Sequence, residues 1–166
     1  SIIHKTLPGL NAVAVYAINN DLQTVLNDNF TDIAYMPMMQ PVWRHFFGMS
    51  HDALHRKLFC YLHDGQMELT AFRRDRFCLN SSTKVTDTND AAYFIINAWQ
   101  QLAMRQNSDI LVIAGTIPGR DALMTQLAKF IANIEEADNN TARADKDEEH
   151  GAEIPLDMQL LFNTTR

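Results

Sequence analysis

Two histidines four residues apart are the first side chains in this sequence whose types and spacing suit chemistry. His51 and His55 lie in the stretch HDALH, and a helix would bring both imidazoles to one face, as metal binding requires. Asp52 stands where the zinc-protease motif has glutamate, and His45 is a loose candidate for a third ligand. We therefore expect polar connector histidines and no metal site, with His51 and His55 as the candidates to test.

A turn between two apolar runs is a candidate phosphate loop. In LHDGQMELTAF, the residues Asp64, Gly65 and Gln66 follow one run and precede the next. Asp-Gly is also the preferred pair for a two-residue type I′ hairpin turn, so the same residues are typical of a tight turn in a sheet. Both interpretations stay open at this point.

A second candidate loop lies in IAGTIPGRDALMTQL, where Gly115, Thr116 and Gly119 separate a buried run from a helical pattern. Free backbone N–H groups and the helix dipole at such a place attract anions. The stretch lacks the Gly-Lys-Ser/Thr ending of a Walker loop and does not match GxGxxG. The alternative is a strand-to-helix turn with Pro118 near the start of the helix.

Other reactive side chains fit structural roles. Cys60 and Cys78 lie in apolar runs without a CxxC motif, which is typical of inert packing thiols. The run before Asp64 contains no carboxylate that could hold the metal ions of a ribonuclease-H-like nuclease. The RRDR stretch at Arg73–Arg76 reads as a solvated turn or as a contact for an acidic partner.

Composition narrows the function classes. The 166 residues carry a net charge of −6 and show no basic patch of the kind that nucleic-acid binding needs. No apolar run approaches the length of a membrane span. We expect a cytoplasmic protein with a protein partner, no nucleic acid and an open oligomeric state. The chain begins SIIHKTLPGL without methionine, so we expect a further N-terminal portion.

The elements that position these residues begin with a β-α-β-α pattern. Residues 11–19 read as a buried strand and residues 20–26 as a helix with Val25 and Leu26 toward the core. DIAYMPM predicts a second strand, and residues 38–49 have helical spacing. This order favours parallel strands with helical crossovers.

The pattern changes at Leu58. A type I′ turn at Asp64-Gly65 predicts the cross-strand pairs Leu62–Met67, Cys60–Leu69 and Leu58–Ala71, all on one face. Both faces of the hairpin carry apolar residues, which predicts helices on both faces of the sheet.

Three elements follow a third strand. They are a helix capped by Asp87 or Thr88, a buried strand over residues 109–115, and a helix over residues 120–134. The third strand is set by a turn at Arg74-Asp75, which would place Phe72 opposite Phe77. Residues 135–153 carry eight acidic side chains and predict a solvated, mobile loop.

The fold class is therefore α/β, with a mixed sheet in β-β-β-α-β-α order, as in the ribonuclease-H-like half of an actin-like ATPase. The sequence resembles a bacterial family classified as a domain of unknown function, whose members have an actin-like ATPase fold with two similar halves. Residues 58–134 carry most of the resemblance, which rests on FCYLHDGQMELTAFRRDRFCLNSS, TNDAAYFIINAWQQLAM, DILVIAGTIPGRDALMTQLAKFI and EIPLDMQLLF. The sequence is also similar, more distantly, to the second half of the actin-like proteins of type IV pilus assembly.

The resemblance implies an arrangement of domains. Residues 1–50 would end a first actin-like subdomain, 51–57 would connect, and 58–166 would form the second, with the acidic loop at about 135–153. The phosphate loop of the first half would then lie outside this chain.

The resemblance also implies where a nucleotide would bind. The nucleotide contacts would be Asp64, Gly65 and Gln66, together with Gly115, Thr116 and Gly119. The first loop is tighter than the Asp-x-Gly-rich loop of such ATPases, and Ala114-Gly115-Thr116 has one glycine where they usually have two. We therefore expect a non-catalytic scaffold without a cofactor; the alternative is an ATPase or sugar-kinase-like enzyme that binds ATP and magnesium.

Overall fold

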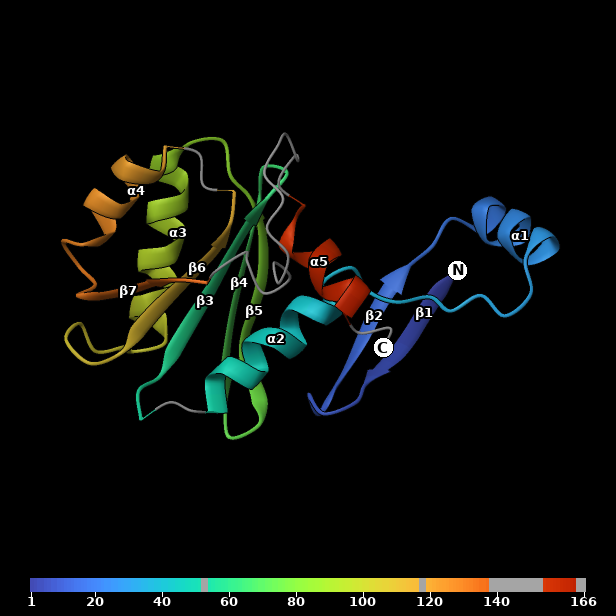
Figure 1. Ribbon diagram of the computed structural model, residues 1–166, viewed down its shortest axis with the longest axis horizontal. Coiled ribbons are helices and arrows are strands. Elements are labelled where there is room, and N and C mark those ends of the chain that lie inside the picture. The colour runs from blue at the N-terminus through green and yellow to red at the C-terminus, as the bar shows by residue number, and fades with distance from the viewer. Residues whose placement is uncertain (52–53, 117–118, 138–153, 164–166) are drawn as a thin grey trace, which may run out of the picture.

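A five-stranded mixed sheet organises the chain in the computed structural model, which describes residues 1–51, 54–116, 119–137 and 154–163 (Figure 1). The elements in chain order are β1 (Ile2–Leu7), β2 (Ala12–Ala17), α1 (Asn20–Asn29), α2 (Gln40–His51), β3 (Lys57–His63), β4 (Gln66–Arg73), β5 (Arg76–Lys84), α3 (Thr88–Gln101), β6 (Ile110–Gly115), α4 (Arg120–Leu127), β7 (Asn133–Glu136) and α5 (Leu156–Asn163).

The sheet has the strand order β5-β4-β3-β6-β7. Strands β3, β4 and β5 form two antiparallel hairpins, β6 pairs with β3 in parallel, and β7 pairs with β6 in parallel. The α3 helix connects β5 to β6, and α4 connects β6 to β7. The predicted β-β-β-α-β-α order is confirmed, with β7 as an additional short strand.

The register of the first hairpin follows from its turn. Asp64 and Gly65 have φ angles of 45° and 71°, as a type I′ turn requires. The pairs Leu62–Met67, Cys60–Leu69 and Leu58–Ala71 form as predicted, and the second hairpin sets Phe72 opposite Phe77. The register shifts between Ala71 and Phe72, so that Cys78 is the extra residue of a β-bulge.

Helices cover both faces of the sheet (Figure 1). On one face, α3 and α4 pack on the sheet and form a core of buried, mostly apolar side chains. These side chains belong to Leu58, Cys60, Leu62, Met67, Leu69, Ala71, Ala91, Ala92, Ile95, Ala98, Trp99, Leu111, Ile113, Leu123, Leu127 and Ile131. On the other face α2 and α5 cover Met39, Val42, Phe46, Phe59, Tyr61, Val112, Ala114 and Leu156. Because side chains alternate along β3, its neighbouring residues serve different cores.

The α3 helix shows how local sequence supports this layer. Asp87 caps it, since its carboxylate accepts hydrogen bonds from the backbone N–H groups of Asn89 and Asp90 at 2.7 and 2.9 Å. Ala92, Ile95 and Trp99 of this helix are buried against the sheet.

The predicted β-α-β-α order of the opening is wrong, although the strand at residues 11–19 and the helices at 20–26 and 38–49 form as β2, α1 and α2. The chain begins with an antiparallel hairpin of β1 and β2, continues into α1, and has no strand at residues 33–36. Strand β2 is not buried, because Val13 and Val15 remain 59% and 60% exposed. Helix α1 buries no side chain, so the expected core face at Val25 does not form.

The helix predicted over residues 120–134 ends early. Helix α4 stops at Leu127, and Ile134 belongs to β7, which pairs with β6. Glu135 and Glu136 also lie in β7, and the rest of the predicted acidic loop, residues 138–153, lies outside the described residues. The division at residues 50 and 58 stays a prediction; α2, on its N-terminal side, packs against the five-stranded sheet.

Within the described residues, no helix is both long enough and apolar enough to cross a membrane.

Candidate functional site

The two predicted phosphate loops lie side by side at the carboxyl ends of the sheet strands. Strands β3 and β6 are parallel and place Leu62 beside Gly115, so both loops emerge at the carboxyl ends of neighbouring strands. The backbone N–H of Thr116 donates to the carbonyl oxygen of Leu62 at 2.9 Å and ties the second loop to the first. In open α/β sheets, ligands usually bind outside the carboxyl ends of the strands.

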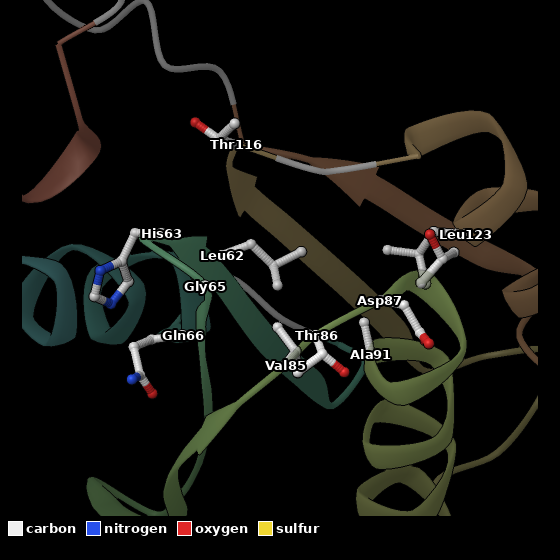
Figure 2. A pocket seen from close by; sticks show the side chains of 11 residues that line it. Leu62, His63, Gly65, Gln66, Val85, Thr86, Asp87, Ala91, Thr116 and Leu123 are labelled. Carbon is white, nitrogen blue, oxygen red and sulfur yellow. The ribbon is translucent and has the colours of Figure 1, made fainter.

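A small hollow lies between these loops and the start of α3 (Figure 2). Its volume is about 50 Å³, and it is lined by Leu62, His63, Gly65, Gln66, Val85, Thr86, Asp87, Thr88, Ala91, Thr116 and Leu123. Leu62 points into the hollow, whereas His63 points to the other side of β3 (Figure 2). Pockets for nucleotide-sized ligands usually measure about 300–1,000 Å³.

The packing of the loop against β3 requires a glycine at position 115. A Cβ atom at this position would lie 2.0 Å from the carbonyl oxygen of Leu62 and 2.9 Å from the ring of Tyr61, and the φ angle is +90°. In nucleotide-binding loops a glycine lets the backbone approach a phosphate. Here the space is filled by β3, which leaves no room for a ligand on that side.

Gly119 has the same role at the start of α4. A Cβ atom there would lie 2.6 Å from Oγ1 of Thr88, so the glycine allows the loop to pack against α3. The backbone N–H groups at the start of α3 are themselves bound by Asp87, as described above. The N–H groups at the start of α3 are therefore used within the fold, whereas the start of α4 has no side-chain cap.

A polar cluster lies on the opposite face of β3. The Tyr61 hydroxyl donates to Oδ1 of Asp157 in α5 at 2.6 Å, and the Ser82 hydroxyl donates to Oε1 of Glu68 at 2.6 Å. The ring of His63 stacks on Tyr61, with its Nε2 atom 3.8 Å from Oε1 of Glu68. No spacing in the sequence signals the Tyr61–Asp157 bond, because the two residues are 96 positions apart.

The titratable groups of these strands are poorly suited to catalysis. Burial, assisted by the bond to Asp157, raises the pKa of the Tyr61 hydroxyl, so it keeps its proton. Burial also raises the pKa of the Cys60 thiol. It raises the pKa of Cys78 too, against the opposing charge of Arg73. Since the thiolate is the nucleophile, these raised pKa values disfavour reactivity. Cys60 is buried as a packing thiol should be, whereas Cys78 is exposed and the packing role predicted for it is wrong.

His51 and His55 do not share a helix face, because α2 ends at His51 and His55 lies beyond it with an exposed side chain. Nδ1 of His51 faces the carbonyl oxygen of Phe47 at 2.8 Å, and its Nε2 lies 3.3 Å from Oδ1 of Asp75. His45 is half-buried beside Phe46, and burial lowers the pKa of its imidazole. Among the described residues no three His, Cys, Asp or Glu side chains are grouped so that they could hold a metal ion.

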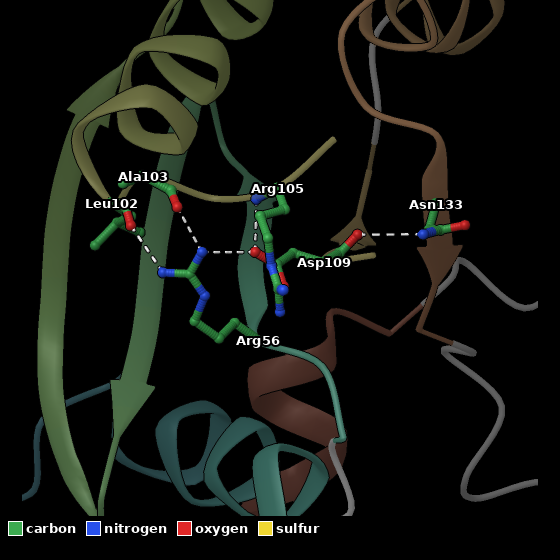
Figure 3. Close-up of polar contacts among 6 residues, drawn as sticks. All are labelled: Arg56, Leu102, Ala103, Arg105, Asp109 and Asn133. Atoms are coloured by element: carbon green, nitrogen blue, oxygen red, sulfur yellow. Dashed lines mark hydrogen bonds and ion pairs between the residues drawn. The ribbon is translucent and has the colours of Figure 1, made fainter. Parts of the chain in front are cut away.

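An ion pair between the buried Asp109 carboxylate and the partly exposed Arg56 guanidinium lies at the amino ends of β3 and β6 (Figure 3). The Arg56 guanidinium donates to Oδ2 of Asp109 at 2.7 Å and to the carbonyl oxygens of Leu102 and Ala103 at 3.0 and 2.5 Å. The backbone N–H of Arg105 donates to the same carboxylate at 2.6 Å. Because its partners are the end of α3 and the loop before β6, this pair joins elements and has a structural role.

Comparison of the sequence with known proteins identifies a family. A family model described as "Protein of unknown function (DUF3822)" matches residues 1–134. A search of the curated proteins finds no match.

Among solved structures, the chain is similar to a crystal structure from Bacteroides thetaiotaomicron, described as a protein with actin-like ATPase fold and unknown function. The sequence identity is 23%, the TM-score is 0.80, and the match covers 98% of this chain and 58% of the other. The chain thus has an actin-like ATPase fold and spans 58% of the length of that relative. The similarity to pilus assembly proteins stays a prediction.

Proposed function

The chain belongs to the DUF3822 family of proteins of unknown function, and we propose that it is a non-catalytic protein with a degenerate actin-like fold that serves as a scaffold or interaction module. The observation that carries this proposal is the filled space at the two candidate loops. The Cβ positions of Gly115 and Gly119 are occupied by Leu62 and Thr88.

Three further features support the proposal. The hollow between the loops holds about 50 Å³, the Asp64-Gly65 turn is a two-residue hairpin, and the start of α3 is capped by its own Asp87. These features disfavour ATP and Mg²⁺ at these residues.

The second candidate is an ATPase or sugar-kinase-like enzyme whose main phosphate loop lies outside this chain. This candidate is favoured because the fold brings the two loops together at the carboxyl ends of the neighbouring strands β3 and β6. In this case Asp64, Gly65, Gln66, Gly115, Thr116 and Gly119 would form one side of a site that a second half completes.

Thermal unfolding with and without ATP and Mg²⁺ separates the two candidates. We expect the melting temperature to stay within about 1 °C, since nothing binds the native state. A nucleotide present at about 100 times its Kd would add about 2.7 kcal/mol, which corresponds to several degrees for a chain of this size. Mg²⁺ alone and CTP with Mg²⁺ are the controls, and a shift specific to ATP would overturn the scaffold proposal.

A further inference from the structure

Strand β5 is the long open edge of the five-stranded sheet. It contains nine residues, whereas β7 at the other edge contains four. The backbone of β5 pairs with β4 on one side. Within the described residues, no backbone hydrogen bond reaches its other side. A long unpaired edge of this kind is a template for another strand.

The outward backbone groups of β5 can be assigned. The N–H of Val85, directly after β5, donates to the carbonyl oxygen of Gly65 at 2.9 Å and so points toward β4. Because backbone groups alternate along a strand, the N–H and C=O groups of Asn80, Ser82 and Lys84 point away from β4. All three residues are exposed.

The side chains of this edge leave its backbone accessible. The Ser82 hydroxyl is bound to Glu68 of β4, and Oδ1 of Asn80 lies 3.3 Å from the Thr70 hydroxyl of β4. Strand β5 contains no proline, which is one of the residues that block edge pairing. From Leu79 to Lys84, beyond the bulge at Cys78, the edge therefore presents its backbone donors and acceptors.

Both ends of this edge are positively charged. Arg73, Arg74 and Arg76 surround an open hollow of about 610 Å³ at the β4–β5 turn, and Lys84 ends β5. None of these four side chains forms an ion pair within the part of the chain that the structure describes. Unpaired cations at one edge of a chain with a net charge of −6 indicate a surface suited to carboxylates.

These charges disfavour a second copy of the chain as the occupant. Antiparallel pairing of two β5 strands in the centred register would put Arg76 opposite Lys84 twice. Parallel pairing would put each cation beside its own copy. Like charges directly opposite destabilise a strand pair, so the edge fits a strand with acidic ends better than itself.

We propose that β5 accepts an extended, acidic segment of a partner protein as a sixth strand of the sheet. The segment would place carboxylates near the arginines of the turn and near Lys84, roughly 26 Å apart at the usual rise per residue. Main-chain hydrogen bonds would supply affinity, and the charged ends would supply orientation and choice of partner. This proposal rests on the proposed role as an interaction module and names its surface.

Fluorescence anisotropy with the whole chain and a labelled peptide tests this proposal. The peptide is as long as β5, has glutamates at both ends and alternates threonine and valine between them. Its controls are the same peptide with lysine ends and the same peptide with a central proline. We expect saturable binding of the acidic peptide and at least about tenfold weaker binding of both controls.

Protein variants locate the binding surface. Asn80→Pro removes an outward N–H and is expected to weaken binding at least about tenfold, whereas Asn80→Ala keeps that N–H and is expected to change it less than about twofold. Arg74→Glu with Arg76→Glu is expected to weaken binding about tenfold or more. Lys129→Glu reverses an exposed charge elsewhere and serves as the matched control. Circular dichroism checks that each variant is folded.

Several results would overturn the proposal. They are absence of binding by the acidic peptide, equal binding of the lysine-ended peptide, and binding that survives both Asn80→Pro and the charge reversals. A dimer that dissociates on Asn80→Pro would replace it with self-association, and equal competition by single-stranded DNA would replace it with nucleic-acid binding. Failure here leaves the nucleotide result untouched, so the two proposals fail independently.

Discussion

Arg56 and Asp109 form an ion pair that joins the amino ends of β3 and β6 to the end of α3. The carboxylate is fully buried, and Arg56 also binds the two carbonyl groups at the end of α3. Arg56→Met leaves these acceptors without the guanidinium, so we expect a loss of about 2–3 kcal/mol in the free energy of unfolding, measured by urea denaturation. Arg105→Ala is the control: its exposed side chain lies 3.9 Å from Asp109, and we expect a loss below about 0.5 kcal/mol.

The same pair gives a pH signature. Burial alone would raise the pKa of the Asp109 carboxyl, but the Arg105 backbone N–H and the Arg56 guanidinium outweigh burial and lower that pKa. A lowered pKa contributes stability that is present above the usual pKa of aspartate and is lost as the pH falls through the folded-state value. The advantage of the wild-type chain over Asp109→Asn should therefore be constant near neutral pH and shrink in acid. An advantage that grows in acid would contradict this assignment.

Gly115 allows strain and close approach to be separated. Gly65 and Gly115 both have positive φ angles, +71° and +90°, but a Cβ atom at Gly65 would meet only the carbonyl oxygen of Val85, at 3.9 Å. Gly65→Ala should cost only the backbone strain, about 1–2 kcal/mol. Gly115→Ala adds a collision with the carbonyl oxygen of Leu62 and should cost more than about 3 kcal/mol. Equal losses for the two variants, measured by denaturation, would show that β3 does not fill this space.

At the scale of elements, the sequence predicted the hairpin register because one turn determines it. Asp64-Gly65 fixes a two-residue loop, and the pairs from Leu62–Met67 to Leu58–Ala71 then follow by counting. The N-terminal hairpin was missed because β1 and β2 bury few side chains, so their apolar alternation carries little information about the core. The end of α4 was missed because Ile131 and Ile134 suit a helix and a strand equally.

Helix α5 depends on a contact that no sequence pattern reveals. It is held on the sheet by the Tyr61–Asp157 hydrogen bond and by Leu156, which is 1% exposed. Tyr61→Phe removes the hydroxyl and leaves the Asp157 carboxylate without its donor. We expect faster amide hydrogen exchange in α5, by about fivefold for a loss near 1 kcal/mol, and unchanged exchange in α3. Equal acceleration in both helices would indicate global destabilisation.

At the scale of the whole molecule, the chain consists of a two-faced sheet unit and an N-terminal part with much exposed apolar surface. Ile2, Val13, Val15, Leu22, Val25 and Phe30 are each more than half exposed. In Figure 1 β1, β2 and α1 lie beside the sheet unit, outside its layers. The related crystal structure extends beyond the matched region. That residues 1–50 belong to a first actin-like subdomain stays a prediction.

Two deletions test where the sheet unit begins. Neither core contains a residue from the first 38 positions, whereas α2 supplies Val42 and Phe46, both fully buried against the sheet. A chain that starts at Met39 should therefore keep one cooperative unfolding transition. A chain that starts at Arg56 also loses α2, and the uncovering of these two contacts should cost about 5 kcal/mol, which is comparable with the whole stability of many domains. We expect calorimetry to show a melting transition for the first variant and none for the second. A stable second variant would place the boundary after α2, as the sequence alone suggested.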